Sequence, residues 1–134
     1  MKRPDEYARL LLQKARGDAQ VVEAACGGSR FEDWIVGFHA QQAVEKALKS
    51  VLSSKEVEYP HTHSLKRLLQ LIEDAKLPLP RDHARLPELS QFAGDIRYGA
   101  RMDLLPADRI DPAWALDCVR RTLAWAERLL AVEP

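Results

Sequence analysis

Apolar residues recur at helical spacing in segment after segment of this chain, and no segment alternates apolar and polar residues as a half-buried strand would. The clearest segment follows Asp111 and Pro112, a cap and a first-turn residue, and its core face comprises Ala115, Leu116, Val119, Leu123, Ala126, Leu129 and Leu130. The 134 residues, 46% of them hydrophobic, suit one domain with one shared core. We therefore predict an all-α fold: a single domain over residues 1–134, built as an up-and-down antiparallel helical bundle of about five helices.

The first two helices are predicted from their start and stop signals. The first begins at Pro4, a residue suited to a first turn, and runs to about Ala25, where two glycines stop it. Its apolar periodicity is interrupted at Lys14 and Asp18. The second extends from Arg30 to about Ser53, because Ser29 and Glu32 have the spacing of a capping box.

The third and fourth helices are shorter. The third covers residues 63–75, where leucines keep the helical rhythm until two prolines end it. Pro87 opens the fourth, which runs through Phe92 and Ala93 to Ile96, and the glycines nearby leave its end undefined. The large residues Trp114 and Trp125 are expected to be packing anchors.

Charge and cysteine content limit the classes of function. Twenty basic and twenty acidic residues cancel, so any contact with nucleotide or RNA must be local. No apolar run is long enough to span a bilayer and the amino end lacks a secretory stretch, so we expect a cytoplasmic protein with no membrane contact. Cys26 and Cys118 are too few for a disulfide framework and are expected to be small core residues.

Sites for a cofactor or a metal are not expected. The sequence has no Gly-rich phosphate loop. His61 and His63 lie close together, but no further ligand follows at a convincing spacing. We therefore predict neither a cofactor nor a metal site.

The second predicted helix has an unusual distribution of polar residues when it is plotted at 100° per residue. Its first half turns large apolar residues to one azimuth, which we expect to face the core: Phe31, Trp34, Ile35 and Phe38. The same azimuth then becomes polar, with Gln42, Glu45 and Lys49. The apolar face moves round to Val44, Leu48, Val51 and Leu52. Because apolar residues cover more than half of its circumference, we expect this helix to be central or shared in a homodimer.

Two explanations of these polar residues are open. Glu45 and Lys49 stand at i and i+4 and could form a solvated ion pair of little energetic value. Alternatively, they belong to a functional face. Their spacing alone does not decide between the two.

Three sequence blocks resemble the HEPN family of small helical domains. Residues 38–49, FHAQQAVEKALK, are similar to the signature helix of the family. His63-Ser64-Leu65 followed by two leucines resembles its next motif, and Ala93 through Arg97-Tyr98 resembles its Arg-Tyr element. The resemblance implies a helical domain. It leaves the activity open among metal-independent ribonucleases, nucleotide-binding accessory subunits of small nucleotidyltransferases, and domains of unassigned role.

The ribonuclease branch carries an arginine and, four to six residues later, a histidine late in the bundle, where they polarise the ribose hydroxyl and the phosphate. That spacing is missing here, because the last histidine is His83 and none follows Arg97 or Arg101. The usual ribonuclease mechanism is therefore not expected. A divergent ribonuclease toxin that uses Arg97, Tyr98 and Arg101 with His63 remains an alternative, as does a purely structural dimeric interaction module.

The candidate site is a cleft that accepts a nucleotide phosphate. Its expected residues are Gln42, Glu45, Lys46, Lys49, His63, Arg97, Tyr98 and Arg101. The lysines would supply positive charge, Gln42 a hydrogen bond, and Arg97 a bidentate phosphate contact. Each has a simpler role available: His63 could cap a helix, and the arginines could pair with Asp95 or Asp103 on the surface.

The chain also lacks the Gly-Ser loop and the paired metal-binding carboxylates that nucleotidyl transfer needs. We therefore expect no catalysis by the chain itself. The resemblance instead implies a nucleotide- or nucleic-acid-binding accessory subunit that acts with a separate small nucleotidyltransferase in a toxin–antitoxin-like pair.

Overall fold

The computed structural model describes residues 3–93 and 109–131 of the chain, and these ranges form helices joined by loops, with no strand. The elements are α1 (Pro4–Cys26), α2 (Asp33–Ser54), α3 (Leu65–Asp74), the 3₁₀ helix η1 (His83–Phe92) and α5 (Pro112–Ala131). The predicted all-α helical bundle is confirmed. Among the described helices, none is long and apolar enough to cross a membrane.

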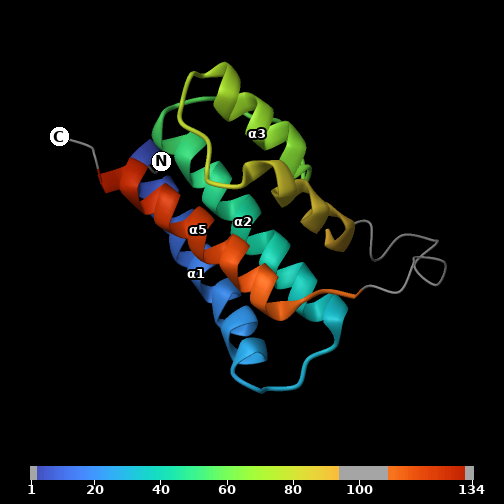
Figure 1. Cartoon of the computed structure of the whole chain (residues 1–134). Coiled ribbons are helices and arrows are strands. Elements are labelled where there is room, and N and C mark those ends of the chain that lie inside the picture. Colours follow the sequence, from blue (N-terminus) through green and yellow to red (C-terminus); the bar gives the residue numbers. More distant parts are fainter. Residues whose placement is uncertain (1–2, 94–108, 132–134) are drawn as a thin grey trace.

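Helix α2 lies at the centre of the bundle and contacts every other described helix (Figure 1). Helix α1 runs antiparallel to α5, because Arg16 pairs with Glu127 and Glu23 pairs with Arg120. Helices α2 and α5 run in the same direction, since Asp33 bonds the amide of Ile110 at one end. Helix α3 and η1 cover the side of α2 that α1 and α5 leave open.

Helix α1 has the predicted bounds to within one residue. It begins at Pro4 with Asp5 and Glu6 in its first turn, where negative charge suits the helix dipole. Its buried face consists mostly of small residues, which allow α2 to approach closely: Ala8, Leu12, Ala15, Ala19 and Val22. Gly28 has a φ of 105°, a conformation that favours glycine, and it ends the helix.

The predicted capping box at the start of the second helix is wrong. Helix α2 begins at Asp33, and no side chain caps it. The backbone amide of Ser29 instead donates to the carbonyl of Ala24 at 2.9 Å, so Ser29 belongs to the end of α1. The Glu32 carboxylate accepts from Nε1 of Trp34 at 2.5 Å.

The third helix is confirmed, although it starts at Leu65, after the cap residue Ser64 whose hydroxyl accepts from the amide of Arg67 at 3.1 Å. The fourth helix is not an α-helix that opens at Pro87. It is a 3₁₀ helix that begins at His83 and carries Pro87 inside it, because the fixed φ of proline is compatible with 3₁₀ geometry. Ala93 already has an extended conformation, and Ile96 lies outside the described residues.

The packing residues are largely those expected. Trp125 is buried, and its Nε1 donates to the carbonyl of Pro78 at 2.8 Å. Trp114 is partly buried, with the Arg85 guanidinium 4.7 Å from its ring centroid. Cys118 is buried, and burial raises the pKa of its thiol to about 11, which keeps it neutral in the core. Cys26 is exposed instead, because it is the last residue of α1.

The first half of α2 does not turn its large apolar residues to the core. Phe31, which the sequence predicts in this helix, lies in the loop before it and is 40% exposed, and Trp34, Ile35 and Phe38 are only partly buried. The buried residues there are Val36, Gly37 and Ala40. The reason is the Phe92 ring of η1, which lies where a Cβ of Gly37 would be, so this face of α2 is the covered one. The expected core azimuth is therefore a partly open apolar stripe.

Candidate phosphate-binding face on helix α2

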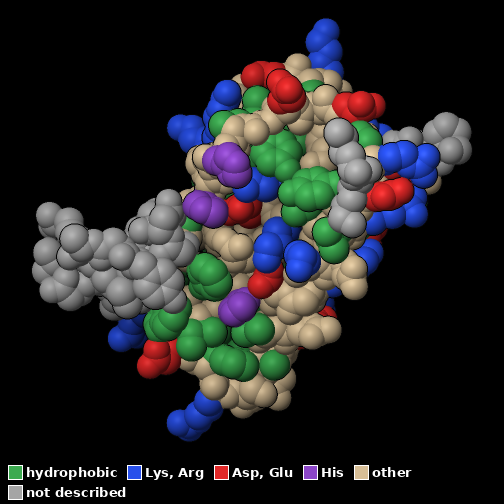
Figure 2. Space-filling model, turned by 180° about the vertical axis from the view of Figure 1, so that it is seen from behind, with side chains coloured by type: hydrophobic (Ala, Val, Ile, Leu, Met, Phe, Trp, Pro, Cys, Tyr) green, Lys and Arg blue, Asp and Glu red, His purple; other side chains and the backbone are tan. Residues whose placement is uncertain are grey.

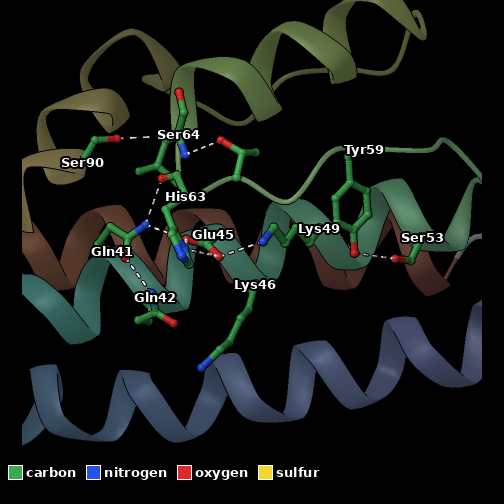
Figure 3. A network of polar contacts seen from close by, with 12 residues as sticks. Gln41, Gln42, Glu45, Lys46, Lys49, Ser53, Tyr59, His63, Ser64 and Ser90 are labelled. Atoms are coloured by element: carbon green, nitrogen blue, oxygen red, sulfur yellow. Dashed lines mark hydrogen bonds and ion pairs between the residues drawn. The ribbon is translucent and has the colours of Figure 1, made fainter. Parts of the chain in front are cut away.

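A buried carboxylate organises the second half of α2. Glu45 is 4% exposed, and it accepts from Nε2 of Gln41 at 2.8 Å and from Nζ of Lys49 at 2.9 Å. The ring of His63 completes the set, with Nδ1 3.0 Å from Oε1 of Glu45 (Figure 3). We call Glu45, Lys49 and His63 the Glu45 triplet.

A second carboxylate reaches α2 from α1. The Asp18 side chain is 12% exposed, and its Oδ2 lies 2.6 Å from Nζ of Lys46. Its Oδ1 lies 2.9 Å from Nδ1 of His39. We call Asp18, His39 and Lys46 the Asp18 triplet.

The two triplets have the same design. Each carboxylate contacts a lysine through one oxygen and Nδ1 of a histidine through the other, and Nδ1 of His63 also lies 3.3 Å from the Glu45 oxygen that Lys49 contacts. A histidine that donates from Nδ1 to a carboxylate directs Nε2 away from it, and the carboxylate fixes the ring orientation. The triplets adjoin along α2, where Nε2 of Gln42 donates to Oε1 of Gln41 at 2.8 Å.

The charges of this face balance when both histidines are neutral, because two carboxylates meet two ammonium groups. Lys49 is 15% exposed in its side chain, so this ion pair is not a solvated one. Desolvated pairs are costly to break, since the remaining charge keeps no partner. The alternative of a solvated surface pair is therefore wrong for Glu45 and Lys49.

The connection between α2 and α3, residues 55–64, crosses the polar half of α2 and is called the strap below (Figure 3). Its Tyr59 hydroxyl lies 3.2 Å from Oγ of Ser53, and Nζ of Lys49 lies 5.6 Å from the centroid of the Tyr59 ring. The carbonyl of His63 accepts from Nε2 of Gln41 at 3.2 Å. Ser64, and not His63, caps α3. His63 is thus placed by its contacts with α2.

The structure brings together four of the predicted site residues in one hydrogen-bonded network: Gln42, Glu45, Lys49 and His63. Lys46 extends towards α1 instead, away from Glu45 (Figure 3). Arg97, Tyr98 and Arg101 lie outside the described residues, as do Asp95 and Asp103.

Sequence reasoning missed Asp18 and His39 as site residues. A signal existed, because Asp18 interrupts the apolar periodicity of α1 at a place where a core helix should be apolar. His39 and Lys46 are seven residues apart and share one azimuth of α2, so a single carboxylate on α1 can meet both. The sequence alone does not show that α1 packs against this face of α2.

The surface around the triplets is polar and mixed in charge. On the side of the molecule turned away in Figure 1, histidine side chains lie among Lys or Arg and Asp or Glu side chains, with hydrophobic side chains beside them (Figure 2). In the part of the chain that the structure describes, no group of three or more His, Cys, Asp or Glu residues could hold a metal ion.

Comparison with known families gives one match. The family model described as HEPN domain matches residues 8–129, which span α1 to α5 and include both triplets. No curated protein matches the chain, and no solved structure matches it.

Proposed function

Because the chain belongs to the HEPN domain family, we propose that it is a nucleotide- or nucleic-acid-binding accessory subunit that acts beside a separate small nucleotidyltransferase, as one half of a toxin–antitoxin-like pair. One observation carries the binding function. Two lysines and His39 of α2, together with His63 of the strap, are held at one face by two carboxylates that are largely removed from solvent. Such an arrangement fixes the donors in place before a ligand arrives.

Phosphate fits this face better than other ligand groups. Ammonium and imidazole N–H groups form short, charge-assisted hydrogen bonds to phosphate oxygens, and an amide such as Gln42 adds a neutral one. Recognition at this face would therefore rest on polar contacts.

Arg97, Tyr98 and Arg101 complete the proposed site. Phe92, just before their segment, packs on Gly37 of α2, and Ile110, just after it, bonds Asp33 of α2. Both contacts lie on the side of α2 that carries Gly37. Arg97 and Tyr98 enter the proposal through their resemblance to the Arg-Tyr element of the family, and Arg101 through its guanidinium close by in the sequence, not through a described contact.

Calorimetric titration of ATP and of GTP tests the site. Wild type should bind, and Lys49→Gln and Arg97→Ala should each weaken binding about tenfold or more, which equals about 1.4 kcal/mol. Lys66→Ala is the matched control, because Lys66 is exposed on α3 beside Leu79 and His83. Equal affinity in all four proteins would leave the triplets as an internal network that fixes helix register.

Catalysis by the chain itself is not part of the proposal, although His63, oriented by Glu45, has the geometry of a general base. We expect purified protein to leave single-stranded RNA uncleaved in the absence of metal. Cleavage that disappears in His63→Ala or Arg97→Ala, with the fold retained by circular dichroism, would instead establish a divergent ribonuclease.

The partner class can be tested independently of the ligand. Co-elution with a small nucleotidyltransferase encoded by an adjacent reading frame would support the accessory role. An isolated gene whose product binds no nucleotide would favour a purely structural interaction module.

A further inference from the structure

We propose that the Asp18 triplet is a second anion subsite, which accepts a phosphodiester group only together with a proton on His39. This inference rests on the proposed function of the α2 face and adds to it a second set of residues and a dependence on pH. It concerns Asp18 and His39, on α1 and on the first half of α2.

The Asp18 triplet has more polar groups than the contact between α1 and α2 needs. The two helices already pack through buried small residues, among them Ala15, Ala19, Ala40 and Ala43. One lysine neutralises Asp18 completely, yet His39 also bonds it. Both His39 and Lys46 keep part of their side chains in solvent. Within the described residues, no hydrogen bond is made by Nε2 of His39, so this atom is available to a ligand.

Charge decides when a ligand can bind. With neutral His39, the triplet sums to zero and offers a phosphodiester no net attraction. With protonated His39, the sum is +1, which matches one phosphodiester charge. From α1, the charged group that faces His39 is Asp18; from α2 it is Lys46, and the Phe38 ring meets the imidazole edge-on with centroids 5.3 Å apart. The charges of Asp18 and Lys46 already cancel each other. The net positive charge that attracts the phosphodiester therefore comes from a proton on His39, which the site takes up when the ligand binds.

The Glu45 triplet offers the same chemistry one helical turn away. Lys46 and Lys49 are three residues apart, about 4.5 Å along the helix axis, and Lys46 extends towards α1 whereas Lys49 extends towards Tyr59 (Figure 3). A nucleic-acid strand that crosses this face would place one phosphate on each triplet. A mononucleotide with a single phosphate would fill one of them.

The experiment uses hexauridylate without terminal phosphates, because its phosphodiesters do not titrate between about pH 5.5 and 8.5, where histidine does. Its affinity for the full-length protein is measured by fluorescence anisotropy at constant ionic strength, since salt alone changes such affinities strongly. Each coupled proton lowers the affinity about tenfold per pH unit above the histidine range. The affinity of wild type should fall with pH in this way. The fall for His39→Gln should be smaller by the contribution of one proton, about tenfold per pH unit.

The matched control is His83→Gln, because His83 lies on η1 with Nδ1 3.1 Å from the carbonyl of Pro80. It should keep the wild-type pH profile. A His39→Gln protein with the wild-type profile would overturn this inference and leave the proposed phosphate face standing. Wild type that binds hexauridylate at no pH would overturn the second subsite, and if ATP and GTP also fail to bind, the proposed function falls with it.

Discussion

The two halves of α2 differ in an unexpected way: the second half buries charged residues, and the first half leaves apolar residues partly exposed. In the second half, Glu45 is almost fully buried and Lys49 nearly so, beneath the strap. In the first half, Ile35 and Phe38 are only partly covered, and Phe31, in the loop just before the helix, is 40% exposed. Both sets lie near one azimuth of the same helix, so the difference comes from what packs against each half.

The difference is caused by the strap, residues 55–64, which packs over the second half of α2 (Figure 3). It brings His63 and Tyr59 over the second half, where their polar atoms satisfy Glu45 and Ser53. No described segment crosses the apolar azimuth of the first half in the same way, because η1 packs on the Gly37 side. Burial of charge is tolerated where partners arrive with the covering segment, and an apolar stripe stays open where none arrives.

The largest effect is expected from removing the central carboxylate of the covered half. Glu45→Ala should lower the free energy of unfolding by about 3–5 kcal/mol, because Lys49 and Gln41 keep their buried polar groups without their acceptor. Urea unfolding followed by circular dichroism measures this. Glu45→Gln is the control, since its amide oxygen still accepts a hydrogen bond, and it should cost clearly less. Equal losses in both variants would mean that charge matters more than hydrogen bonding.

A smaller loss is expected at the border between the two halves. Gly37→Ala should lower the free energy of unfolding by about 1–3 kcal/mol, because the new Cβ would overlap the Phe92 ring and push η1 outward. Gly17→Ala is the matched control in α1, where nothing lies within 4 Å of the added atom. It should stabilise the protein by up to about 1 kcal/mol, as alanine favours helix over glycine. Thermal unfolding of both variants gives the comparison, and a stabilised Gly37→Ala protein would contradict the packing described for η1.

The sequence predicts the helices better than it predicts the faces they bury. Helix α1 and α5 follow from local signals, namely Pro4 at a first turn and the cap of Asp111, whose Oδ1 accepts from the amide of Ala113. The face of α2 that is buried in the core does not follow from local signals, because it depends on Phe92, more than fifty residues away in the chain. Likewise Glu45 stands out from the pattern of its own helix, whereas the contacts of Asp18 depend on the pairing of α1 with α2.

The smallest effect on folding is expected from a substitution in the open apolar stripe. Its main effect should be on the oligomeric state. We propose that a second copy covers the apolar stripe, so that wild type sediments as a two-fold dimer of the 15.2 kDa chain. Phe31→Ser should change the stability of the protomer by less than about 0.5 kcal/mol, since the ring is already partly in water. It should nevertheless raise the dimer dissociation constant about tenfold, because aromatic residues contribute most to such interfaces.

Tyr7→Ser is the matched control for this substitution. Tyr7 is 43% exposed on α1, and with Phe31 it is one of two large hydrophobic residues exposed in the described ranges. Sedimentation velocity across micromolar concentrations should separate the two variants, with Tyr7→Ser behaving as wild type. Wild type that sediments at the mass of one chain would show that the stripe stays open in solution. Equal weakening by both substitutions would place the contact elsewhere than on the apolar stripe that begins at Phe31.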